Sequence, residues 1–179
     1  MKALLIVDVQ NDFLPGGALP APDGNKVIPV INRLGDKFEY VIASQDWHPE
    51  DSIHFKKWPE HCVANTWGAD FPDSLNTKII GKFLIKGTGN QDDGYSAFEA
   101  ANINLDKFLK YNDIDELFVT GLTTEYCVKN SVLDALKSGY KTHVILDAVE
   151  GVKARPGDQE KAFEEMEKAG AKLLTSDQI

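Results

Sequence analysis

The sequence has few cysteines, no basic cluster and no long apolar run. Two cysteines, Cys62 and Cys127, are too few for a disulfide framework, so a free thiol is available and a reducing, cytoplasmic setting is expected. The formal net charge of -9 is spread along the chain, which argues against nucleic acid or an anionic membrane as a partner. The opening apolar run ends at Asp8, too early for a signal peptide or a membrane span.

The length and composition fit one compact unit. At 179 residues the chain has the size of an ordinary domain, and it contains no internal repeat, low-complexity tract or linker. We therefore expect a single domain over residues 1–179 with one functional site. Whether the chain forms a homo-oligomer is left open.

Short apolar segments alternate with segments of helical period. Strands are predicted over 3–7, 40–43, 83–85, 117–120, 143–146 and 172–174, and helices over 27–34, 105–109, 128–136 and 156–169. This alternation predicts a three-layer α/β/α domain built on a mostly parallel six-stranded sheet.

Reactive side chains follow several of the predicted strands. Asp8 ends the first strand, Lys86 ends the third, and Cys127 follows the fourth at the start of a helix. Loops after parallel strands converge at one edge of the sheet, so these groups should lie together. The helix start is expected to lower the pKa of Cys127 below about 8.5. An acid, a cation and a thiol are what an activated cysteine nucleophile needs.

Each of these residues also has a simpler interpretation. Asp8 could cap a turn, Lys86 could be an ordinary solvated lysine, and Cys127 could be a small buried hydrophobe in a helix. Only the expected convergence of all three at one edge favours catalysis over packing.

A second group of candidate residues lies in a long segment without clear period, residues 46–76. A loop of this length in a compact domain is usually functional. Asp46 and His48 are two apart, so on extended chain they face the same way, and His54 and His61 follow. One carboxylate with imidazoles suits zinc, iron or manganese better than magnesium or calcium. The alternative is a polar loop with solvated histidines.

Motifs along almost the whole chain carry a family resemblance. They are Leu5–Phe13, Gln45–His48, Trp58–Val63, Gly68–Phe71, Lys86–Gly87, Tyr95–Glu99 and Val119–Val128. On these residues the chain resembles the nicotinamidases and pyrazinamidases of the isochorismatase-like cysteine hydrolases. The aspartate, lysine and cysteine mark the superfamily, whereas Asp-x-His followed by Trp-Pro-x-His-Cys is more specific to nicotinamidases.

The resemblance implies a set of roles within the isochorismatase-like hydrolase fold. The implied catalytic triad is Asp8, Lys86 and Cys127. The implied ligands of one divalent transition metal ion are Asp46, His48 and His61, with His54 as a more variable fourth. The implied oxyanion hole is formed by the backbone N–H groups of Thr123 and Cys127, after a cis peptide between Leu122 and Thr123. The implied substrate-binding residues are Leu122 and the three ring-contacting positions Phe13, Trp58 and Tyr95.

The resemblance also implies a reaction. The chain is expected to hydrolyse nicotinamide to nicotinate and ammonia through a cysteine thioester, with pyrazinamide as a further substrate and zinc as the first choice of metal. Two alternatives stay open: another amidohydrolase of the superfamily acting on a ureido or carbamoyl substrate, and a non-catalytic metal-binding redox sensor. Release of ammonia from nicotinamide separates them.

Overall fold

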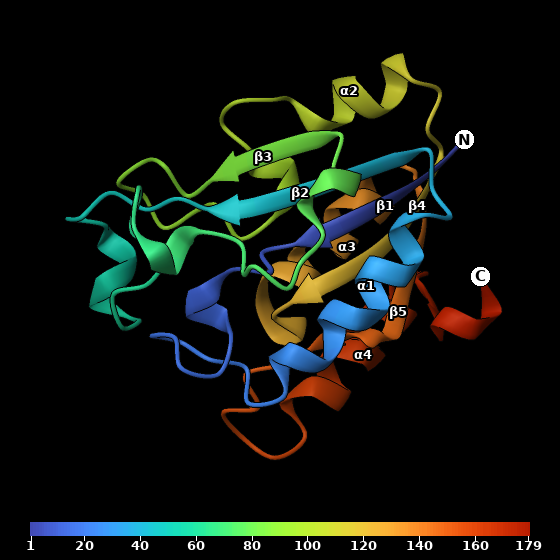
Figure 1. The fold of residues 1–179 in the computed structure, drawn as a ribbon. Coiled ribbons are helices and arrows are strands. Elements are labelled where there is room, and N and C mark those ends of the chain that lie inside the picture. Colours follow the sequence, from blue (N-terminus) through green and yellow to red (C-terminus); the bar gives the residue numbers. More distant parts are fainter.

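A computed structural model describes residues 1–179 and contains one six-stranded sheet in the order β3-β2-β1-β4-β5-β6 (Figure 1). The strands are β1 (Lys2–Val7), β2 (Tyr40–Asp46), β3 (Lys82–Lys86), β4 (Glu116–Leu122), β5 (Lys141–Glu150) and β6 (Lys172–Leu174). The helices are α1 (Val27–Gly35), α2 (Leu105–Tyr111), α3 (Lys129–Lys137) and α4 (Asp158–Lys168). All five strand pairs are parallel, so the predicted fold is confirmed and the sheet is wholly parallel.

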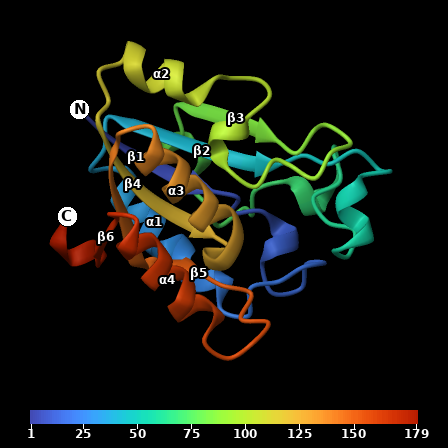
Figure 2. The ribbon, with the colours of Figure 1, turned by 180° about the vertical axis from the view of Figure 1, so that it is seen from behind.

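The two faces of the sheet bury two separate apolar clusters. On β1, Leu5 packs in the cluster that contains residues of α2, α3 and α4, whereas Leu4 and Ile6 pack in the cluster that contains α1. Figure 1 shows α1 in front of the sheet, and Figure 2 shows α3 and α4 on the opposite face. Because both faces are covered, a strand in the middle of the sheet needs an unbroken apolar sequence.

Several strands extend further than the apolar pattern predicted. β2 was expected to end at residue 43 but continues to Asp46, whose Cα is paired with that of Lys86 on β3. The extra residues are polar and lie at the carboxyl end of the strand. An apolar pattern identifies a strand only where the side chains of that strand face the core. The predicted strand therefore ended where its side chains begin to face a polar site.

The sheet has a switch point between β1 and β4, because the chain continues from β1 to one side and returns through β4 on the other. Open parallel sheets form their crevice at such a point, beyond the carboxyl ends of the strands. Gly121 lies there with φ at +107°, and a Cβ on it would be 2.0 Å from the carbonyl oxygen of Val7. Only glycine allows these two strands to approach so closely. No helix is both long and apolar enough to cross a membrane.

Candidate active site

Asp8 follows β1 directly and is fully buried. Its backbone adopts φ of +46°, and its N–H donates to the carbonyl oxygen of Ser44 at 3.1 Å. The Ser44 hydroxyl donates to Asp8 Oδ1 at 2.7 Å, while Oδ2 lies 2.7 Å from the Nζ of Lys86. Both carboxylate oxygens are therefore fixed in direction.

Lys86 ends β3 and is also fully buried. Besides Asp8, its ammonium group contacts the carboxylate of Asp46, the carbonyl oxygen of Gly94 at 2.7 Å and the Sγ of Cys127 at 3.4 Å. Burial lowers the pKa of Lys86, but Asp46 and Asp8 more than offset this and hold it well above its usual value. Lys86 is thus a permanent cation at the centre of the cluster.

Cys127 lies in a helical turn, Thr124–Val128, that leads into α3. Its Sγ lies within 4.8 Å of carboxylate oxygens of both Asp8 and Asp46. Burial raises the pKa of the thiol well above its usual value; Lys86 lowers it, and the two carboxylates raise it further. The expectation that the helix start would lower this pKa is therefore wrong, because the thiol is desolvated between two negative groups. Burial thus favours the neutral form of the thiol.

Three of the four predicted metal ligands converge. Asp46, His48 and His61 are buried and offer ligand atoms within 4.8 Å of one another. The Nδ1 of His48 lies 2.9 Å from the carbonyl oxygen of Gly87, and the Nδ1 of His61 lies 2.7 Å from that of Pro59. A carbonyl accepts only from a protonated Nδ1, so each Nε2 of the neutral ring keeps a lone pair, as in metal sites.

The charge of the buried cluster also fits a cation. Two carboxylates, those of Asp8 and Asp46, face the single ammonium group of Lys86, and burial raises the pKa of Asp8 although Lys86 opposes the shift. Burial lowers the pKa of His61 and so favours the neutral form that binds metals. His48 Nε2 is buried without a hydrogen-bond partner, 3.5 Å from Asp46 Oδ2. These residues fit a divalent transition metal ion.

His54 lies next to these three residues. Its ring stacks on that of His48, with centroids 4.7 Å apart and an interplanar angle of 28°. Its Nε2 is buried without a hydrogen-bond partner. Three ligand candidates therefore converge, and the role of His54, which the resemblance gave as the more variable fourth position, stays a prediction.

A pocket opens above Cys127, and most of its wall is apolar or aromatic. Its lining residues are Phe13, Leu19, Asp46, His54, Trp58, His61, Gly94, Tyr95, Thr123, Tyr126, Cys127 and Val152. Trp58 and Tyr126 pack edge to face with centroids 4.9 Å apart. Aromatic walls with a few convergent polar groups suit a small, flat ligand.

Most predicted substrate contacts line this pocket. Phe13, Trp58 and Tyr95 do so, as does Thr123 of the predicted oxyanion hole, whereas Leu122 does not. The side chain of Leu122 is fully buried in the core cluster that contains α1, so only its backbone could face a ligand. The peptide bond between Leu122 and Thr123 is cis, as the resemblance implied.

Several residues that were not predicted also support the site. Gln10 accepts from the backbone N–H of Asp46 and donates to its carbonyl oxygen, both at 2.8 Å, and so fixes the end of β2. Its position two residues beyond Asp8, at the end of a buried strand, was an available signal. Three pocket residues were also not predicted. Tyr126 is adjacent to Cys127 in the sequence, whereas Leu19 and Val152 come from loops in which no sequence motif indicated a functional role.

A family model and several known proteins that are similar to this chain all indicate the same family. An isochorismatase domain model matches residues 2–178. The chain is 44% identical to the nicotinamidase of Escherichia coli, over 97% of this chain and 94% of the relative. It is similar to a pyrazinamidase of Pyrococcus horikoshii solved in complex with zinc, at 40% identity and a TM-score of 0.85 over 97% and 98% of the two chains. A PnC1 from L. infantum in complex with nicotinate has 33% identity and a TM-score of 0.92, over 99% and 93%.

Proposed function

Because the chain belongs to the isochorismatase domain family, we propose that it is a nicotinamidase, one domain that hydrolyses nicotinamide to nicotinate and ammonia. The observation that carries the proposal is the buried contact of Lys86 with both Asp8 and the Cys127 thiol, directly beneath an aromatic pocket. Pyrazinamide, with a ring of similar size, is proposed as a further substrate.

In the first step the negative charge of the Asp8 carboxylate is transferred to the substrate, and the net charge of the site does not change. Asp8 takes the proton of the Cys127 thiol while the sulfur attacks the carboxamide carbon, so negative charge leaves the carboxylate as it develops on the substrate. Lys86 contacts both the carboxylate and the sulfur, and it stays close to the charge throughout. The raised pKa of the thiol is compatible with this step, because a free thiolate is not required beforehand.

The later steps return every group to its starting form. The carboxamide oxygen takes up the electron pair, and the backbone N–H groups of Thr123 and Cys127 donate to it. When the C–N bond breaks, Asp8 gives its proton to the nitrogen and ammonia leaves. A water molecule then attacks the thioester and loses a proton to Asp8, which returns it to the Cys127 sulfur as the acid is released.

The ring is held by the pocket wall and by the metal-binding group. Phe13, Trp58 and Tyr95 would contact its faces and edge. Asp46, His48 and His61 would hold zinc, with iron or manganese as alternatives and His54 as the more variable fourth position. A bound ion supplies a positive contact for the ring nitrogen, which orients the carboxamide toward the sulfur.

The proposal is tested by ammonia release from nicotinamide, with metal analysis of the purified protein. Cys127→Ala should lower turnover by at least about 10³-fold, because no other group can form the thioester. Cys62→Ala is the matched control: Cys62 is also free and buried, and it should keep turnover within about tenfold. Full turnover in Cys127→Ala would refute the assignment.

The same assay decides between the alternatives. Hydrolysis of an N-carbamoyl substrate in preference to nicotinamide would place the chain with other amidohydrolases of the superfamily. A protein that binds metal but releases no ammonia from any amide would favour a redox sensor. The two free, buried cysteines are in keeping with a proposed cytoplasmic location.

A further inference from the structure

One wall of the pocket comes from the loop that follows β5. Val152 in this loop lines the pocket together with Cys127 and Tyr126. The loop is bonded to Glu125, which lies in the same helical turn as Cys127. Glu125 Oε2 accepts from the backbone N–H of Val152 at 3.1 Å, and Oε1 accepts from that of Lys153 at 2.9 Å. The turn that carries the nucleophile is thus bonded to the part of the pocket wall that contains Val152.

The loop is shaped to receive this carboxylate. A Cβ at Gly151 would lie 2.4 Å from Glu125 Oε1, so the close approach depends on glycine. Lys153 adopts φ of +55°, and successive N–H groups of 152 and 153 point to the two oxygens. Successive backbone donors of this kind form an anion-binding concavity, and bonds to a charged acceptor are about twice as strong as neutral ones.

The loop's other tethers are weaker. Lys153 Nζ pairs with Glu150 at 2.8 Å and with Asp23 at 3.3 Å, but the lysine side chain is 41% exposed. Exposed pairs of this kind contribute little. Neither pair reaches the nucleophile turn, whereas Glu125 bonds that turn directly to residues 152 and 153.

We propose that Glu125 is a positioning residue that holds the Val152 wall against the nucleophile turn and thereby sets the width of the pocket. The proposal rests on the proposed function for its substrates, since pocket width is measured through the amides that the enzyme accepts. Glu125 itself need not touch the ring or the reacting atoms.

The first test is Glu125→Gln. Glutamine keeps the shape and one acceptor but turns an NH₂ group toward a backbone N–H, so one bond is lost and the loop loosens. We expect KM for nicotinamide to rise about tenfold with kcat within about threefold. For quinoline-3-carboxamide, a wider ring system, kcat/KM relative to nicotinamide should rise about tenfold.

Two further variants test the cause. Val152→Ala should shift selectivity the same way, and combining it with Glu125→Gln should add less than twofold, because both act on one wall. Glu125→Asp keeps both acceptor oxygens and should recover part of the selectivity. The matched control is Glu165→Gln on the same surface groove, where Glu165 pairs with Lys129 at 2.8 Å; it should change no parameter more than twofold.

A measurement without substrate separates this proposal from the proposed function. Amide hydrogen exchange at 152 and 153 should be about tenfold faster in Glu125→Gln and unchanged in Glu165→Gln. If the protein hydrolyses no nicotinamide, the proposed function fails, while exchange still decides the role of Glu125. Unchanged exchange, or an equal fall of kcat for both amides at constant KM, would overturn the positioning role.

Discussion

The two ends of the sheet hold similar charged groups in opposite surroundings. At the carboxyl end, Lys86 contacts Asp8 and Asp46 with no part of its side chain exposed. At the amino end, Glu116 of β4 pairs with Lys141 at 2.6 Å, and the Lys141 side chain is 57% exposed.

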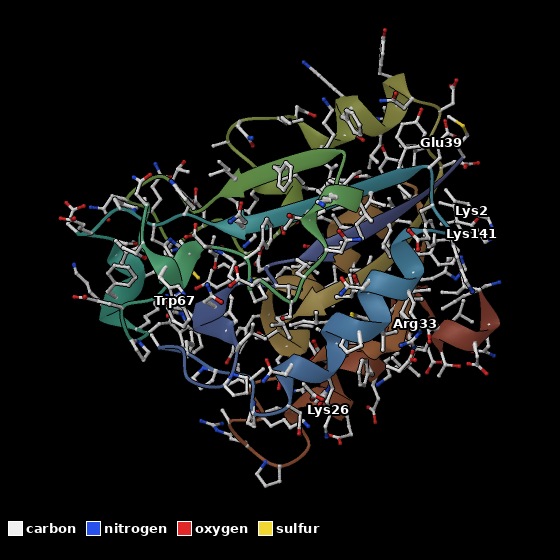
Figure 3. The ribbon with its side chains drawn as sticks, viewed as in Figure 1. Lys2, Lys26, Arg33, Glu39, Trp67 and Lys141 are labelled. Carbon is white, nitrogen blue, oxygen red and sulfur yellow. The ribbon has the colours of Figure 1, made fainter.

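Further groups complete the amino-terminal cluster. Glu116 also accepts from His143 Nε2 at 2.7 Å and lies 3.9 Å from Lys2. Figure 3 shows Lys2 and Lys141 side by side near the amino terminus, with Trp67 of the long loop on the opposite side of the molecule. The two clusters thus occupy opposite ends of parallel strands.

The difference teaches what burial does to an ion pair. An exposed pair is screened by water and contributes little to stability. A buried pair must first lose its hydration, and so it is weak evidence for stability unless its charges serve chemistry. On this comparison the carboxyl end is organised for function and the amino end for modest stabilisation.

The largest effect is expected from Lys86→Met. The change leaves two buried carboxylates without their cation, so the free energy of unfolding should fall by about 3–5 kcal/mol. Ammonia release should fall by at least about 10³-fold, because the charge on Asp8 and Cys127 loses its partner. Urea unfolding and the ammonia assay measure the two effects. A stability loss below that of Lys141→Met would break the comparison.

A smaller effect on activity is expected from His61→Asn. Loss of this candidate ligand should weaken metal binding by about 100-fold or more, with KM raised and kcat lowered together. Elemental analysis and kinetics check it. His143→Asn is the matched control, since His143 is the one histidine outside the loop and should leave the metal content unchanged.

At the amino end, Glu116→Gln should cost about 1 kcal/mol or less at pH 7. Burial raises the pKa of Glu116, but its bonds to Lys141 and His143 lower it more, so the net shift is downward. A depressed pKa gives stability that is present above the unfolded value of about 4.3 and is lost as pH falls through the folded value. The melting temperatures of wild type and variant should differ by a constant amount between about pH 5 and about pH 7, and they should converge below about pH 4. A gap that widens in acid would contradict this sign.

The smallest effect is expected from Lys141→Met, at about 0.5 kcal/mol or less, because Glu116 keeps its other partners. In about 1 M salt the difference from wild type should vanish, since exposed charges are screened at that ionic strength. The stability loss caused by Lys86→Met should remain nearly the same in about 1 M salt as in dilute buffer, because its charges are buried. Equal salt dependence of the two variants would remove the distinction between the clusters.

The sequence predicted the architecture better than the limits of its elements. All six strands and four helices were expected, because buried strands and amphipathic helices have different periods. Ser44 and Asp46 were not expected within a strand, since their polar side chains face the site rather than the core. The residues of the candidate site were predicted as a set, and their catalytic and ligand roles stay predictions.

Other features depended on contacts that no local pattern contains. The raised pKa of Cys127 follows from burial and from the carboxylates of Asp8 and Asp46, two groups far from it in sequence. The place of His54 beside the ligand group, and the Val152 wall bonded to Glu125, likewise arise from loops that meet only after folding.

The amino-acid sequence alone specified which chemical groups lie at the ends of the strands, and in which order strands and helices follow one another along the chain. Periodicity and motif spacing are local properties, so they can be recognised along a chain. Tertiary structure alone decided which charges are buried, which atoms touch and how the groups titrate. These properties depend on distance and on exclusion of water, and both are set only when separate segments pack together.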